Sequence, residues 1–128
     1  MERVRFLEYR GKRVLLLDFT HCIPEDVFNI MAETQRIVTA QPPQSLLTLS
    51  DMSGGHFNRE AVRRMKEVAA VDGPHVKRAA MVGVESLPKV FYKGIMEFSA
   101  RHFPAFKTRE QALDWLVEET EAQAMPAA

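Results

Sequence analysis

The segment from Ser50 to Asn58 holds the residues of this sequence that are best suited to binding. Gly54 and Gly55 permit backbone angles, and a close approach of another molecule, that larger residues prevent. The segment follows an apolar run and leads into a predicted helix, and open α/β sheets bind ligands where strand ends meet helix N-termini. The alternative is structural, with the glycines forming the turn and the polar side chains bonding to local backbone. The candidate binding residues are Asp51, Ser53, Gly54, Gly55, His56 and Asn58.

A basic face continues from this segment into the helix that Asn58 is predicted to cap. Arg59, Arg63 and Lys66 are spaced by four and three residues, which places them within about 60° on one side of a helix. Such a face can bind an acidic protein partner or anionic lipid head groups. The alternative is an ordinary solvated helix surface.

A later helix, predicted from Ser86 to about Arg101, has more apolar surface than one buried face requires. Six of its residues lie within about 140° and are expected to face the sheet, namely Leu87, Val90, Phe91, Gly94, Ile95 and Phe98. Tyr92 and Met96 form a second apolar ridge, which indicates a partner interface, such as a homodimer, or a ligand cavity beneath the helix. The alternative is that the last strand and the terminal helix cover this ridge. The candidate interface or pocket residues are Phe91, Tyr92, Ile95 and Met96.

Residues suited to nucleophilic catalysis or metal binding form no recognisable motif. Cys22 can act as a nucleophile only if folding brings His56 and Asp18 to it, whereas its neighbour Ile23 favours a buried cysteine. The four histidines include no pair at i and i+4, so no metal site is predicted. We therefore predict no catalytic residues, no metal and no cofactor, and a hydrolase-like enzyme is only the third hypothesis.

Composition narrows the class of protein further. The 128 residues suit one domain, and 17 basic against 17 acidic residues give no net charge, which disfavours a nucleic-acid-binding protein. A single cysteine excludes an internal disulfide. No apolar run reaches the roughly 18 residues of a membrane span, and the first residues do not resemble a signal peptide. We expect no transmembrane segment and a cytoplasmic location.

The predicted elements follow the order ββαβαβαβα. Strands that alternate with helices require a largely parallel sheet, while a short turn at Gly11 makes the first two strands an antiparallel hairpin. Pro24 and a capping box at Thr108–Gln111 mark two of the helix starts. We predict one α/β domain over residues 1–121, with a mixed sheet of about five strands and about four helices, and a flexible tail over 122–128. The predicted strands are Val4–Arg10, Arg13–Phe19, Ser45–Leu49, Val76–Val84 and Phe103–Phe106.

The stretch Asp51-Met52-Ser53-Gly54, followed by Phe57, resembles the Asp-Leu-Ser-Gly-x-x-Phe motif of the STAS domain, the sulfate transporter and anti-sigma factor antagonist fold. The element order is the same, and the resemblance spans about residues 3–119. Further stretches resemble bacterial proteins described as SpoIIAA-like, which are related in fold to CRAL-TRIO lipid carriers. These stretches include Val14–Phe19, Gln41-Pro42-Pro43, Val82-Gly83-Val84 and Ala112…Trp115-Leu116.

This resemblance implies a non-enzymatic regulatory module that acts through protein contacts. The relation to CRAL-TRIO proteins implies an alternative, a carrier or sensor of a small apolar or lipid-like ligand. In anti-sigma factor antagonists a partner kinase phosphorylates a serine at the start of the second helix. The matching positions here are Arg59 and Glu60, which have no hydroxyl, so the resemblance implies a module without that phosphoserine switch. Ser50 and Ser53 are the nearby hydroxyls, and we expect both to make local hydrogen bonds.

Overall fold

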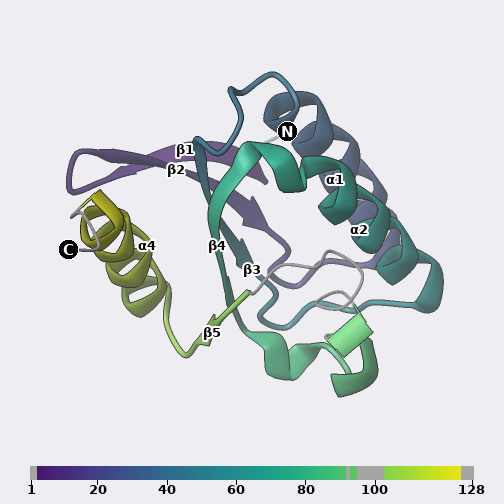
Figure 1. The fold of residues 1–128 in the computed structure, drawn as a ribbon. Coiled ribbons are helices and arrows are strands. Elements are labelled where there is room, and N and C mark those ends of the chain that lie inside the picture. Colours follow the sequence, from purple (N-terminus) through teal and green to yellow (C-terminus); the bar gives the residue numbers. More distant parts are fainter. Residues whose placement is uncertain (1–2, 92, 95–102, 125–128) are drawn as a thin grey trace.

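A five-stranded sheet forms the centre of the molecule, and helices cover both of its faces (Figure 1). The structure, a computed structural model, describes residues 3–91, 93–94 and 103–124, with residues 119–124 described by their backbone alone. The strands are β1 (Val4–Tyr9), β2 (Lys12–Asp18), β3 (Leu46–Asp51), β4 (Val76–Val82) and β5 (Ala105–Phe106). The labelled helices are α1 (Pro24–Val38), α2 (Arg59–Asp72) and α4 (Arg109–Ala124), with short 3₁₀ helices η1 (Gly73–His75) and η2 (Val84–Ser86).

The order of strands across the sheet is the same as their order along the chain. β1 is antiparallel to β2, whereas β2, β3, β4 and β5 are parallel to one another. The hairpin turn holds Arg10 and Gly11 at positive φ, 52° and 80°, which suits the twist of the two strands that it joins. The predicted α/β fold with a mixed, mostly parallel sheet is confirmed.

Alternation along the strands gives the sheet two apolar faces. On β2, Leu15 and Leu17 belong to a core that includes residues of α1 and α2, while Val14 and Leu16 belong to a core that includes residues of α4. Figure 1 shows α1 and α2 side by side on one face and α4 on the other. Parallel strands joined by crossovers of one hand place the successive helices α1 and α2 together. We call these the α1/α2 face and the α4 face.

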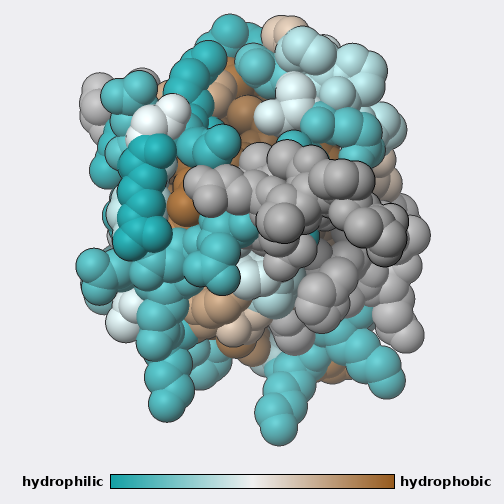
Figure 2. Space-filling view, turned by 60° about the vertical axis from the view of Figure 1, so that its left-hand side comes forward, coloured by the Kyte–Doolittle hydropathy of each residue, from teal (hydrophilic) through white to brown (hydrophobic). Residues whose placement is uncertain are grey.

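Two predicted helix starts have the expected hydrogen bonds. Oδ1 of Asn58 accepts a hydrogen bond of 2.8 Å from the N–H of Ala61 and so caps α2. Oγ1 of Thr108 accepts a bond of 3.1 Å from the N–H of Gln111 at the start of α4. Hydrophilic residues project from the side of the molecule drawn in Figure 2, and hydrophobic residues are recessed between them.

The chain after β4 departs from the prediction of one helix capped by Ser86. Ser86 lies in η2, and the described helical residues begin at Lys89, after Pro88. The expectation that Val90 faces the sheet is wrong, because its side chain is 71% exposed. Phe91 instead packs against the core of the α1/α2 face, and the residue before it is rotated by about 100° away from that core.

Several predicted boundaries also shift. β3 includes Ser50 and Asp51, because pairing continues on both sides, from Asp51 to Asp18 of β2 and to Val82 of β4. α4 continues through residues 122–124, which the sequence assigned to a tail. Tyr92, Ile95 and Met96 lie outside the described residues, so the second apolar ridge stays a prediction. Among the described helices, none has the length and apolar character needed to cross a membrane.

Candidate functional site

Two carboxylates and one guanidinium meet at the carboxyl ends of β2 and β3. Asp51, the last residue of β3, is buried, and its Oδ2 accepts a hydrogen bond of 2.6 Å from Nε of Arg109. Nη2 of Arg109 lies 3.6 Å from Oδ1 of Asp18, the last residue of β2. Arg109 is the first residue of α4, so the cluster ties this helix to the sheet. These contacts support a structural role for Asp51, the alternative to a role in binding.

The neighbours of Asp18 hold it in its charged form. Burial acts to raise the pKa of Asp18, but hydrogen bonds from the hydroxyl and the N–H of Thr20, at 2.6 and 3.0 Å, act against it. Together with the positive charges of Arg109 and Arg3, these bonds hold the pKa below its usual value. Sequence reasoning missed Arg109, although two aspartates at neighbouring parallel strand ends indicate a need for a cation.

The glycines of the loop after β3 are packed against the protein itself. Gly54 has a φ of 69°, and a Cβ there would lie 2.5 Å from the ring of His21. A Cβ on Gly55 would lie 2.9 Å from the carbonyl oxygen of Phe19. The N–H of Gly54 donates a bond of 2.8 Å to Oγ of Ser86, the last residue of η2. Both glycines therefore serve the packing of the loop.

The N–H of Ser53 donates a bond of 3.0 Å to Oδ1 of Asp51, so the side chain of Asp51 bonds to local backbone, and the local bond expected of the Ser53 hydroxyl stays a prediction. Gly83, which follows β4, lies directly against Ser53, since a Cβ on Gly83 would overlap the backbone nitrogen of Ser53. Ser53 is half-buried. Its role in the described structure is thus to shape the loop.

The outer part of the loop and the start of α2 form an exposed polar surface. Gly54, His56 and Asn58 are exposed, as are the first and fifth residues of α2, Arg59 and Arg63. Neither arginine makes a hydrogen bond or an ion pair with another residue in the part of the chain that the structure describes. We call these five residues the loop–α2 surface.

Lys66, the third residue of the predicted basic face, is not part of the loop–α2 surface. It is half-buried, and a Cβ added to Gly94 would lie 2.9 Å from its Nζ. The side chain of Lys66 therefore packs against the helical segment after Pro88. The structure places two of the three predicted basic residues in solvent and brings the third against a neighbouring element.

The cysteine that could act as a nucleophile lies in the core. Cys22 is fully buried, and burial raises the pKa of its thiol, which opposes formation of the reactive thiolate. The connection to His56 is through backbone, with its N–H donating to the carbonyl oxygen of Cys22 at 2.8 Å. Asp18 faces Thr20 and Arg109 instead. Within the described ranges, no group of three or more His, Cys, Asp or Glu residues could hold a metal ion.

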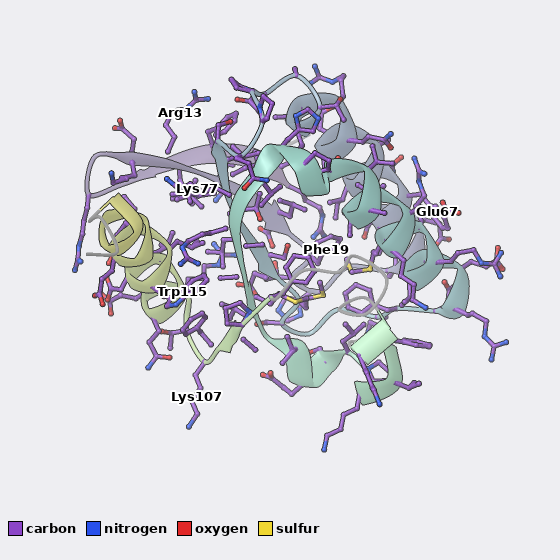
Figure 3. All side chains as sticks on the ribbon, in the orientation of Figure 1. Arg13, Phe19, Glu67, Lys77, Lys107 and Trp115 are labelled. Atoms are coloured by element: carbon purple, nitrogen blue, oxygen red, sulfur yellow. The ribbon has the colours of Figure 1, made fainter. Side chains whose placement is uncertain are left out.

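A second candidate site is a cavity of about 80 Å³ between the sheet and the helices of the α1/α2 face. Phe19, labelled in Figure 3, lines it from the end of β2, and Phe103 lines it from the segment before β5. Four polar residues also line it: Thr34 of α1, Thr48 and Ser50 of β3, and Asp72 at the end of α2.

This cavity is not the pocket that the sequence predicts. The predicted pocket lies under the later helix, around Phe91, and this residue is absent from the described lining. A usable signal existed in Thr48 and Ser50, because residues two apart on a strand point to the same face of the sheet. Two hydroxyls on the core side of a central strand indicate a polar site.

Comparison with models of protein families, with curated proteins and with solved structures finds no significant match for this chain. The resemblance to STAS and SpoIIAA-like proteins therefore rests on the residues quoted above.

Proposed function

We propose that this chain is a non-enzymatic regulatory module of the STAS or SpoIIAA-like type that binds an acidic protein partner through its loop–α2 surface. The observation that carries the proposal is the pair of exposed guanidinium groups on Arg59 and Arg63, beside a loop whose shape is fixed from within. No catalytic step is assigned to the module.

The fixed shape of the loop supports binding because it lowers the entropy lost on association. The hydrogen bonds from Ser53 to Asp51 and from Gly54 to Ser86 hold the part of the loop next to β3. The N–H of His56 bonds to the carbonyl of Cys22. A partner would thus meet a preformed surface, from which only the arginine side chains need ordering.

The chemistry of the surface favours a partner rich in carboxylates. Arginine pairs with carboxylates through two parallel hydrogen bonds and is enriched at the energetic centres of protein interfaces. Arg59 and Arg63 are one helical turn apart, so both guanidinium groups can reach one acidic segment. Contacts of this exposed kind weaken as salt is added.

We further propose that this binding is constitutive. Arg59 and Glu60 occupy the positions of the family's phosphorylated pair. Ser50 lies within β3 and lines the cavity, and Ser53 is half-buried with its N–H bonded to Asp51. Phosphosite mapping of protein from its own cells tests this, and stoichiometric phosphate on either serine would overturn it.

The main experiment compares two variants with the same change of charge. The double variant Arg59→Glu, Arg63→Glu alters the loop–α2 surface, and Lys77→Glu, Lys107→Glu alters two exposed lysines that lie away from α2 (Figure 3). Each purified chain captures partners from an extract of its own cells at low and high salt. We expect the arginine variant to lose at least about tenfold in capture, and the lysine variant to keep it.

The proposal fails if both variants capture the same partner equally, or if capture by the unaltered chain does not weaken at high salt. In that case the apolar later helix becomes the better candidate. Self-association through Phe91, Tyr92, Ile95 and Met96 is a separate prediction, tested by sedimentation velocity, and a monomer at all concentrations would contradict it. A cytoplasmic location also stays a prediction, which microscopy of the tagged chain tests.

A further inference from the structure

Two residues of β3 with hydroxyl groups line the cavity on the α1/α2 face. Leu46, the first residue of β3, and Met52, which follows β3, belong to the core of the α1/α2 face. Thr48 and Ser50 lie between them at steps of two residues, so they point to the same face of the sheet. Strands in the middle of a parallel sheet are usually apolar on both faces. The neighbouring strands follow that rule, with Leu17 on β2 and other apolar residues on β4. The two hydroxyls are therefore an exception at the cavity.

The helices opposite bring further polar groups to the same place. Thr34 of α1 is only 3% exposed, and its Oγ1 has no hydrogen-bond partner among the residues that the structure describes. A buried threonine within a helix usually bonds to the carbonyl four residues earlier, and Thr34 makes no such bond. Asp72, also buried, adds a carboxylate from the end of α2. Polar groups from three elements thus converge on one cavity.

The size of the cavity limits what can fill it. A volume of about 80 Å³ has room for about five to eight water-sized groups. A long acyl chain exceeds this volume. The remaining wall is apolar and includes four methionine thioethers, which adapt to ligands of different shape. These methionines are Met31, Met52, Met65 and Met81.

We infer that this cavity binds a small compact molecule with an apolar body and one hydrogen-bonding end, which is held by Thr34, Thr48, Ser50 and Asp72. A hydroxyl or amide at that end can accept from the threonine and serine hydroxyls and donate to the carboxylate. The apolar body lies against the methionines and the two phenylalanines that line the cavity. This site is separate from the loop–α2 surface, so it does not depend on the proposed function.

Phenol and toluene are suitable probes because they have equal numbers of non-hydrogen atoms and differ in one hydroxyl. The readout is the NMR signals of the methionine methyl groups in the full chain, titrated with each probe. We expect saturable shifts at the four cavity methionines, with phenol binding at least about fivefold more tightly than toluene, the value of one hydrogen bond.

Thr34→Val removes the hydroxyl with little change of volume, and Thr39→Val makes the same change at an exposed position after α1. We expect Thr34→Val to remove the preference for phenol while toluene still binds, and Thr39→Val to leave both affinities unchanged. Thermal unfolding of both variants verifies that they fold, and Thr34→Val is expected to melt no lower than the unaltered chain.

Three results would overturn the inference. One is the absence of saturable shifts at the cavity methionines with either probe. Another is equal affinity for phenol and toluene that Thr34→Val does not change, because the cavity would then not recognise a hydrogen-bonding group. The third is displacement of bound phenol by myristate, since a long-chain lipid would then be the occupant. A failed capture experiment on the loop–α2 surface changes none of these outcomes.

Discussion

Replacing Arg109 by methionine should destabilise the protein by about 2 kcal/mol at neutral pH. The change keeps an apolar side chain of similar length but leaves the Asp51 carboxylate, whose side chain is 7% exposed, without its 2.6 Å partner. Breaking a fully buried ion pair costs about 3–5 kcal/mol, and a charged hydrogen bond contributes about 1.5–3 kcal/mol. The side chain of Arg109 is 37% exposed, so water can partly replace its guanidinium, and the lower end of these ranges applies.

Urea unfolding followed by the fluorescence of Trp115 measures this loss well. Trp115 is the only tryptophan of the chain and lies on α4, with its ring centroid 5.7 Å from that of Phe106. Circular dichroism follows the whole fold in the same samples. A loss of about 2 kcal/mol corresponds to a fall in Tm of about 8 °C for a domain of this size.

Lys107→Met is the matched control, because Lys107 is an exposed cation two residues before Arg109. We expect it to change the free energy of unfolding by less than about 0.5 kcal/mol. If Arg109→Met is equally mild, the reasoning is refuted, and apolar packing alone holds α4 on the sheet. If the fluorescence transition comes before the dichroism transition, α4 detaches first, as expected when its tie to β3 is cut.

Three more predictions follow from single residues. Gly83→Ala should lower the free energy of unfolding in urea by about 2–4 kcal/mol, because φ is 75° and the new Cβ would overlap Ser53. Gly11→Ala, with φ of 80° and open space around it, should lower it by only about 1–2 kcal/mol. Equal losses for the two variants would contradict this. The pKa of Asp18 is lower in the folded than in the unfolded state, where it is about 3.9, so its stabilising effect is present above that pH and is lost as pH falls through the folded pKa. Asp18→Asn should therefore destabilise the protein clearly at pH 7 and little at pH 2, and a cost independent of pH would refute it. Cys22 should react with a thiol reagent only as fast as the protein unfolds, and rapid labelling of the folded chain would contradict its burial.

The fold could be predicted because its signals are local. The continuous apolar run Val14–Leu17, the turn at Gly11 and the caps at Asn58 and Thr108 each depend on neighbouring residues, and a strand, a hairpin turn and two helix starts are found there in the structure. The wrong prediction that Val90 faces the sheet also has a local cause. Pro88 delays the helix to Lys89, which changes the residues that face the core.

The contacts that define the two sites are not local, and periodicity does not report them. Asp51 and Arg109 are 58 residues apart, and no helical or strand pattern pairs them. Thr34, Thr48 and Asp72 come from three separate elements, and only the packing of α1 and α2 on β3 brings them to one cavity. The loop after β3 is an intermediate case. The sequence singles out its glycines, but it does not predict that they pack against His21 and Phe19.

Hydrogen–deuterium exchange of the chain, alone and with its captured partner, tests the central claim most directly. It reports which backbone amides a partner covers, without any substitution that could disturb the fold. The account predicts added protection over residues 54–63, which span the loop–α2 surface, with little change in α4. Protection confined to residues 89–94, or to α4, with residues 54–63 unchanged, would contradict it.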